Sequence, residues 1–244
     1  MRHPPEPDRP TRPLAPLDAY RALAKPLLVG GAAALLAWAF IRISSEMAEG
    51  DTRGFDMVLL RAAQTLRLAH PWVVSVMRDL SGLGSTAVLT LFTAGTVGYL
   101  WLVRARLTAL LLALAIVSGS VGVSLLKTSF GRLRPDAAFA ELVAPGLSFP
   151  SGHASQSAIV FLTLGALFAS TRSRRLERLY ILAMALLMTL LVGLSRIVLG
   201  VHWATDVAAG WAFGAAWALI WLLLARWLTR RCGRNTVASD LPPL

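Results

Sequence analysis

Six long apolar runs constrain this chain more than any other feature of its sequence. They cover residues 26–44, 85–103, 107–128, 152–170, 178–198 and 203–226. A helix needs about 20 apolar residues to cross a hydrocarbon core of roughly 30 Å, and each run is close to that length. Only 15% of the residues are charged, fewer than an ordinary soluble domain carries. The sequence therefore predicts an all-α polytopic membrane protein, a bundle of six transmembrane helices.

The basic residues predict the orientation of these spans. An even number of spans places both termini on one side, and that side holds 15 of the 24 Lys and Arg residues but only 5 of the 13 acidic ones. Cytoplasmic loops are rich in Lys and Arg, and the short loops 104–106 and 171–178 carry the strongest bias. We therefore expect both termini to be cytoplasmic, in a multi-pass protein of the cell (inner or plasma) membrane. The opposite ends of the spans then face the periplasm or exterior.

The predicted membrane domain, residues 26–228, lies between two polar tails. Residues 1–25 are rich in Pro and Arg and lack periodicity, which predicts a disordered cytoplasmic tail. Residues 229–244 are predicted to form a second cytoplasmic tail. The longest outer connection, residues 45–84, contains FDMVLLRAAQTLR, where apolar residues recur at helical spacing with the charges opposite. This pattern predicts a helix lying in the membrane interface.

Membrane lipids, rather than nucleic acid, are the partners that the charge predicts. The formal net charge is +11, but no basic patch is interleaved with aromatic residues and no nucleic-acid motif occurs. The excess charge orients the spans and suits contact with anionic headgroups.

In the last run, Gly210 and Gly214 form a GxxxG pair, which predicts close helix packing. The oligomeric state is not predicted.

Three polar islands interrupt the apolar pattern. They are KTSFGRLRP from Lys127 to Pro135, FPSGHAS from Phe149 to Ser155, and SRIVLGVHWATD from Ser195 to Asp206. Ionisable side chains at membrane depth are costly and are functional candidates by default. The charge-derived topology, drawn without reference to these islands, brings all three to the outer face. The sequence thus predicts one site assembled from separate segments.

Cations dominate the islands, which indicates an anionic ligand. Arg134 and Arg196 offer planar forks that match phosphate oxygens, and Lys127 adds a point charge. Ser151 can cap a helix beginning at Gly152, where free backbone N–H groups form an anion site and the missing side chain permits close approach. A tetrahedral phosphate fits such a cradle better than a carboxylate does.

The two histidines supply reactivity. Asp206 follows His202 by four residues, so on a helix both side chains face the same way and the carboxylate can fix the imidazole tautomer. The other ring nitrogen is then free to attack phosphorus, while His153 can protonate the leaving group and later activate water. His202 and Asp206 could instead bind a metal, but the nearby cations oppose another one. We predict no metal and no cofactor.

Three motifs in this order resemble the signature of the type 2 phosphatidic acid phosphatase superfamily: Lys127-x6-Arg134-Pro135, Pro150-Ser151-Gly152-His153 and Ser195-Arg196-x5-His202-x3-Asp206. The resemblance covers residues 127–206 and implies a metal-independent phosphatase. It implies that the phosphate is bound by Lys127, Arg134, Ser151, Gly152 and Arg196. It implies that His202 is the nucleophile, His153 the acid and base, and Asp206 the orienter of His202.

Residues outside the signature receive structural interpretations. Arg132 lies inside the first island, but the signature does not require it, so we expect a solvated loop residue. Asp136, Glu141 and His70 are expected to be structural or exposed.

The resemblance implies a lipid phosphatase that hydrolyses a phosphate monoester or diphosphate through a phosphohistidine at the outer membrane face. Undecaprenyl diphosphate, phosphatidylglycerol phosphate and phosphatidic acid are the candidate substrate types. A lipid phosphotransferase is an open alternative, because the same phosphohistidine could pass its phosphoryl group to a lipid alcohol. A transporter is a second alternative, but transporters bind their substrates near the midplane, whereas these islands lie at span ends.

Overall fold

A computed structural model describes residues 16–142 and 144–239 of the chain. Within these residues the regular structure is entirely helical, as predicted. The helices are α1 (Pro16–Glu49), α2 (Arg53–Ala69), α3 (Trp72–Gly82), α4 (Thr86–Leu102), α5 (Arg106–Phe130), α6 (Gly152–Ser170), α7 (Arg175–Val198) and α8 (Ala204–Ser239), with a short 3₁₀ helix, η1 (Ala137–Phe139), between α5 and α6.

Six helical stretches in the described part of the chain are long and apolar enough to cross a membrane, which confirms the number predicted. Five of them lie within single helices. The remaining one, the second along the chain, joins α3 to α4 from Trp72 to Leu102. The second span therefore starts earlier than the predicted 85–103, because SGLGS, expected as a turn into the span, interrupts the helix only briefly.

The ends of the domain differ from the prediction. Helix α1 begins at Pro16, so residues 16–25, predicted to be disordered, are helical. Helix α8 continues to Ser239, so the predicted second tail is helical over residues 229–239. Extending an existing helix costs less free energy than nucleating a new one, so a long apolar helix readily continues into the polar residues that flank it. The remaining tail residues, 1–15 and 240–244, lie outside the described residues.

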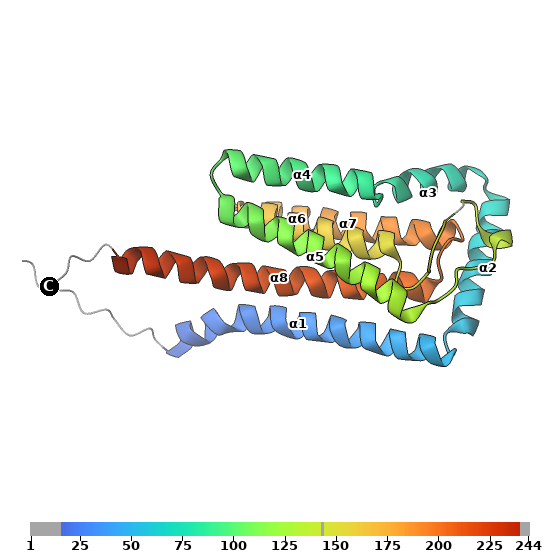
Figure 1. Cartoon of the computed structure of the whole chain (residues 1–244), viewed down its shortest axis with the longest axis horizontal. Coiled ribbons are helices and arrows are strands. Elements are labelled where there is room, and N and C mark those ends of the chain that lie inside the picture. The colour runs from blue at the N-terminus through green and yellow to red at the C-terminus, as the bar shows by residue number, and fades with distance from the viewer. Residues whose placement is uncertain (1–15, 143, 240–244) are drawn as a thin grey trace, which may run out of the picture.

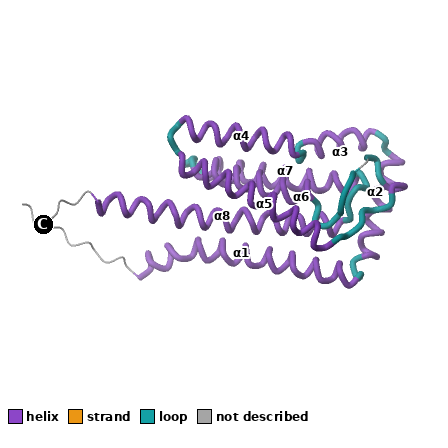
Figure 2. The backbone as a smooth tube through the Cα atoms, viewed as in Figure 1, coloured by secondary structure: helices purple, strands orange, loops and turns teal. Residues whose placement is uncertain are grey.

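The long helices run side by side, and α2 lies across one end of the bundle (Figure 1). The N-terminal end of α1 and the C-terminal end of α8 lie together at the opposite end. Helix α6 packs most extensively against α7 and α8, and α1 packs along α8. The loops that follow α5 and α7 gather beside α2 (Figure 2), so segments distant in sequence meet at this end.

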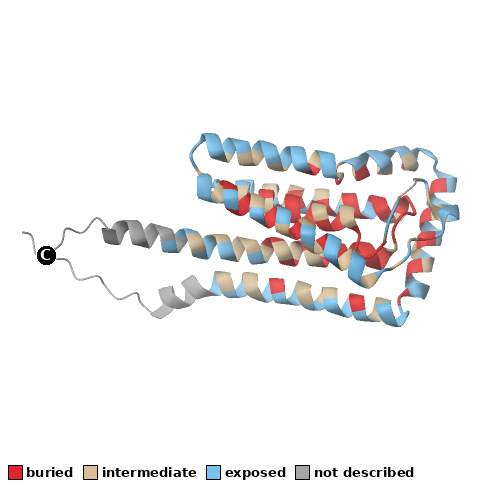
Figure 3. Ribbon diagram, viewed as in Figure 1, coloured by how far each residue is buried: buried red, intermediate tan, exposed pale blue. Residues whose placement is uncertain are grey.

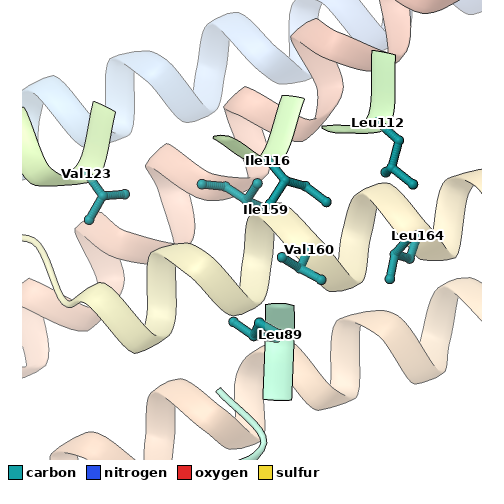
Figure 4. Packing of buried hydrophobic residues seen from close by; sticks show 7 residues of the cluster. All are labelled: Leu89, Leu112, Ile116, Val123, Ile159, Val160 and Leu164. Carbon is teal, nitrogen blue, oxygen red and sulfur yellow. The ribbon is translucent and has the colours of Figure 1, made fainter. Parts of the chain in front are cut away.

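A cluster of branched aliphatic side chains joins α4, α5 and α6. Its buried members are Leu89, Leu112, Ile116, Val123, Ile159, Val160 and Leu164 (Figure 4). Lipid tails are as apolar as these side chains, so within a membrane the cluster stabilises the bundle through van der Waals packing rather than through removal from water. The outward faces of α4 and α1 are exposed (Figure 3), and they carry large apolar residues such as Leu91 and Leu35. Such faces suit contact with lipid.

Close packing of α8 on α6 positions the polar end of the bundle. A Cβ atom added at Gly214 would lie 2.6 Å from Ala158 Cβ, and one at Gly210 would lie 3.0 Å from the carbonyl oxygen of Ser151. Neither position has room for a side chain, which confirms the close packing predicted from the GxxxG pair.

Helix α2 matches the predicted amphipathic helix, but the predicted separation of apolar and charged faces is wrong. Asp56 and Arg67 are buried together with Leu60 and Ala63, whereas Phe55 and other apolar residues are exposed. Both charges are buried because they have partners. Arg67 donates to the carbonyl oxygens of Val198 and of Phe139, the latter at 2.7 Å, and its Nε lies 3.1 Å from Glu141 Oε1.

Candidate active site

The first island reaches the site through the end of α5 and the loop after it. Gly131 ends α5 with a φ of 63°, a left-handed conformation that glycine adopts without strain. Lys127 Nζ donates to the carbonyl oxygen of Leu147 at 2.9 Å. Arg134 Nη1 donates to the carbonyl oxygen of Val201 at 2.7 Å and lies 3.0 Å from His202 Nε2. These contacts join the first island to the third and to the segment just before the second.

The second island presents the N-terminus of α6 to the same place. Ser151 N donates to the carbonyl oxygen of Asp206 at 2.9 Å, which holds the start of α6 against the first turn of α8. Ser151 takes the predicted N-cap position, but its hydroxyl makes no cap bond. Its Oγ is buried and has no hydrogen-bond partner among the described residues. A Cβ at Gly152 would lie 3.5 Å from Lys127 Cε, so the lysine packs directly over this helix end.

The third island contributes a buried histidine–aspartate pair. His202 is 1% exposed and Asp206 is fully buried. His202 Nδ1 lies 3.3 Å from Asp206 Oδ2, as their spacing predicts. A guanidinium has no acceptor, so Nε2 of His202 must accept from Arg134 and Nδ1 must carry the proton. This is the tautomer in which Nε2 is unprotonated and its lone pair accepts from Arg134.

Arg196 and His153 complete the predicted set. Arg196, in the last turn of α7, is 6% exposed, and its Nη1 donates to Ser81 Oγ at 2.6 Å. Its Nε is buried and finds no partner in the part of the chain that the structure describes. His153 lies partly exposed in the first turn of α6, directly after Gly152. Two donors, Ser151 Oγ and Arg196 Nε, are thus left for a further group.

A glycine that the sequence reasoning did not single out holds the loops of the site together. Gly200 has a φ of 73°, and a Cβ there would lie 1.8 Å from the carbonyl oxygen of Phe139. Glu141 N also donates to the carbonyl oxygen of Leu199 at 3.0 Å. The segment after Arg134 therefore packs directly on the loop that carries His202.

Burial and charge set the protonation of the site. Burial lowers the pKa of His202 to about 4; the hydrogen bond to Asp206 opposes this shift, and the charges of Arg134 and Arg196 add to it. Burial also lowers the pKa of Arg134, while the charge of Asp206 raises it. The His202 imidazole is consequently neutral at physiological pH.

The free enzyme should show this shift directly. We expect the His202 imidazole to titrate near pH 4, because burial disfavours the cation. Above that pH the neutral ring dominates, and below it the ring charges. Nuclear magnetic resonance of protein labelled at its four histidines measures the midpoint, and His202→Gln assigns the signal. A midpoint near 6.5, the ordinary value for histidine, would contradict the buried environment.

Three polar residues at this end were missed or misread. Arg132, expected to be solvated, is 15% exposed at its side chain and forms ion pairs with Asp206 and Asp56. Ser148 is fully buried; its hydroxyl donates to Asp206 Oδ2 and lies 3.2 Å from His202 Nδ1. Ser148 precedes the predicted second island by one residue, and Arg132 lies inside the first, so proximity to the motifs could have flagged both. Asp56 carries no comparable local signal.

The acidic residues of the loop between α5 and α6 have structural roles, as predicted. Asp136 accepts from Ala138 N at 2.9 Å and caps η1. Glu141 pairs with Arg67 of α2.

Comparison with known proteins shows that the chain is similar to membrane phosphatases. The family model described as the PAP2 superfamily matches residues 106–230. Phosphatidylglycerophosphatase B of Bacillus subtilis is 29% identical over 179 residues, covering 72% of this chain and 85% of the relative. Decaprenylphosphoryl-5-phosphoribose phosphatase of Mycobacterium tuberculosis is 33% identical over 173 residues, covering 69% of this chain and 89% of the relative.

A solved structure shares the fold. The crystal structure of a transmembrane PAP2-type phosphatidylglycerolphosphate phosphatase from Bacillus subtilis aligns with a TM-score of 0.71 at 24% identity. The alignment covers 82% of this chain and 96% of that structure. The arrangement of helices is therefore shared along nearly the whole length of that protein.

Proposed function

Because this chain belongs to the PAP2 superfamily, we propose that it hydrolyses a lipid phosphate monoester or diphosphate through a phosphohistidine formed on His202. Its relatives are named phosphatases, and the chain is a multi-pass membrane phosphatase. The proposal adds the nucleophile, the face of the membrane and the class of substrate.

The state of His202 is the observation that carries the proposal. Its Nδ1 is held by Asp206 and its Nε2 lies 3.0 Å from Arg134 Nη1, so the free lone pair points toward a cation. A phosphate bound at Arg134 would therefore lie against the nitrogen that can attack it. The low pKa of His202 keeps that nitrogen unprotonated at neutral pH.

The chemistry then proceeds in two displacements. Nε2 of His202 attacks phosphorus, the bond from phosphorus to the leaving oxygen breaks, and His153 gives its proton to that oxygen. Water then attacks the phosphohistidine, His153 takes a proton from it, and the phosphorus–nitrogen bond breaks to release phosphate and neutral His202. His153 thus acts first as general acid and then as general base, and returns to its starting state.

The cations and the free donors supply the cradle. Lys127, Arg134 and Arg196 offset the charge on the phosphoryl oxygens, and positioned donors of this kind are worth most where charge develops in the transition state. The unpartnered Ser151 Oγ and Arg196 Nε provide two further hydrogen bonds. The N-terminus of α6 adds its backbone N–H groups.

We place the site at the outer face of the inner or plasma membrane. It lies at the end of the bundle opposite the described termini (Figure 1), and the distribution of Lys and Arg favours cytoplasmic termini. A site at the end of the bundle suits a substrate with its headgroup in water and its tails in lipid. The partners are thus a lipid phosphate and the surrounding lipids.

A panel of lipid phosphates tests the proposal. Purified protein is incubated with undecaprenyl diphosphate, phosphatidylglycerol phosphate, phosphatidic acid and lipid A, and released phosphate is measured with the lipid product. We expect phosphate and dephosphorylated lipid in equal amounts from at least one member. A phosphorylated lipid acceptor in place of free phosphate would instead indicate a phosphotransferase. Absence of turnover with every member would contradict the proposal.

Phosphate release should survive removal of divalent metals. The cradle consists of Lys and Arg side chains with helix N–H groups, which stabilise phosphoryl charge without a metal. We expect turnover within about twofold of the control after incubation with a chelator, and strong inhibition by vanadate, which mimics the trigonal-bipyramidal state at phosphorus. Loss of activity that added metal restores would favour a metal bound by His202 and Asp206.

A further inference from the structure

The two oxygens of Asp206 have separate sets of partners. Oδ2 faces His202 Nδ1, accepts from Trp203 N at 3.0 Å and accepts from the hydroxyl of Ser148. Oδ1 accepts from Arg132 Nη1 at 2.7 Å. The contact of Asp206 with the histidine therefore depends on how Arg132 holds its other oxygen.

Arg132 bridges two buried carboxylates. Its Nη2 donates to Asp56 Oδ2 at 2.7 Å, while its Nη1 donates to Asp206 and, at 2.8 Å, to Thr205 Oγ1. Both carboxylates have fully buried side chains. The guanidinium also lies over the Trp203 ring, 5.4 Å from its centroid. A planar fork bonded at both ends fixes the separation and the rotation of its partners.

Asp56 ties this bridge to the start of α8. Its Oδ1 accepts from Thr205 N at 2.9 Å, and its Oδ2 accepts from Thr205 Oγ1 at 2.7 Å. The first N–H groups of a helix have no partner within the helix, so Asp56 caps α8 from a different helix, α2. The capped residue, Thr205, directly precedes Asp206.

We propose that Asp56 and Arg132 are positioning residues for Asp206, so that α2 forms part of the catalytic framework. They hold the carboxylate at the angle that keeps the Nδ1 proton of His202 hydrogen-bonded and its Nε2 unprotonated. The inference rests on the proposed roles of His202 and Asp206. It assigns a function in catalysis to the segment 53–69, which carries no part of the signature.

Two conservative substitutions test the bridge. Asp56→Asn keeps the size of the side chain but removes the charge, and Arg132→Lys keeps the charge but cannot bond both carboxylates with one planar group. We expect each to lower kcat by roughly 10- to 100-fold with KM near the wild-type value, because small misplacements of a catalytic group cost about that much. If either variant fails to fold, the other decides, and wild-type kcat in the folded variant overturns the inference.

Arg67→Met is the matched control for docking of α2. Arg67 is a second buried charge on the same helix, and its partners are Val198, Phe139 and Glu141 rather than Asp206. We expect this variant to lower the melting temperature while kcat stays close to the wild-type value. If it lowers kcat as much as Asp56→Asn does, the effect belongs to docking in general and the inference is overturned.

A double-mutant cycle with Asp206→Asn separates positioning from general damage. If Asp56 and Arg132 act through Asp206, their substitutions should change kcat by less than about threefold once Asp206 is Asn, because coupled residues are not additive. Equal losses in both backgrounds would overturn the inference. The proposed function fails separately: it falls if His202→Ala still turns over. The inference alone falls if His202→Ala is inactive while Asp56→Asn and Arg132→Lys keep wild-type kcat.

Discussion

Phosphate release should fall by roughly six orders of magnitude, to background, when His202 is replaced with alanine, by analogy with the loss of a nucleophile in a hydrolase. The side chain is buried with Nδ1 on Asp206 and Nε2 beside Arg134, so alanine removes the nitrogen positioned to attack a phosphate bound at Arg134. Water would have to attack phosphorus directly, and the covalent intermediate would be lost.

The measurement combines steady-state turnover with trapping of the intermediate. Substrate labelled at phosphorus, mixed with enzyme and quenched in alkali, should label the wild-type protein and leave His202→Ala unlabelled. His70→Ala is the matched control, because His70 is exposed in the turn between α2 and α3 and should keep full activity. Substantial turnover by His202→Ala would remove the nucleophile assignment, whatever the other residues do.

The spans were predictable because they depend on local composition. A run such as 152–170 is apolar enough to favour a helix in lipid whatever surrounds it, and α6 has those bounds. The ends of the domain were less predictable, because α1 and α8 continue into polar sequence. Where a helix stops depends on flanking propensity and capping rather than on apolar content.

Convergence of the three islands was also predictable, because topology alone brings span ends to one face. Contacts such as that from Arg134 Nη1 to His202 Nε2, 3.0 Å, follow from that convergence. The contact between Asp56 and Arg132, which leads to Asp206, was not predictable. Asp56 and Arg132 are separated by 76 residues and meet only after α2 folds across the bundle.

The amphipathic pattern of α2 gave a wrong prediction of which side chains are buried, for a related reason. Periodicity assigns charges to the solvated face, and this holds unless the charges find buried partners. Asp56 and Arg67 both do, in loops and helix ends that no local pattern identifies. A charge placed among apolar residues on a helix that covers a catalytic face is therefore better interpreted as a sign of a buried ion pair.

Asp206→Asn should slow catalysis by roughly two to four orders of magnitude, the range seen when a triad orienter loses its charge. Both oxygens of Asp206 accept hydrogen bonds, Oδ1 from Arg132 and Oδ2 from His202, Trp203 and Ser148. An asparagine has one acceptor oxygen, so its amide N–H₂ must face one of these donor sets. The cation of Arg132 holds the carbonyl oxygen more strongly, which turns the N–H₂ toward His202.

That orientation changes the tautomer of His202, the proposed nucleophile. An amide donor beside Nδ1 favours an unprotonated Nδ1, so the proton moves to Nε2, the nitrogen that must attack phosphorus. The proposed phosphate cradle of Lys127, Arg134 and Arg196 is untouched, so inhibition by inorganic phosphate, which binds without the transition-state geometry, should stay within about threefold of wild type while kcat falls. Asp79→Asn, an exposed substitution on α3, is the control. Equal losses of phosphate affinity and kcat would show that Asp206 shapes the cradle, and unchanged kcat would show that the imidazole needs no orienter.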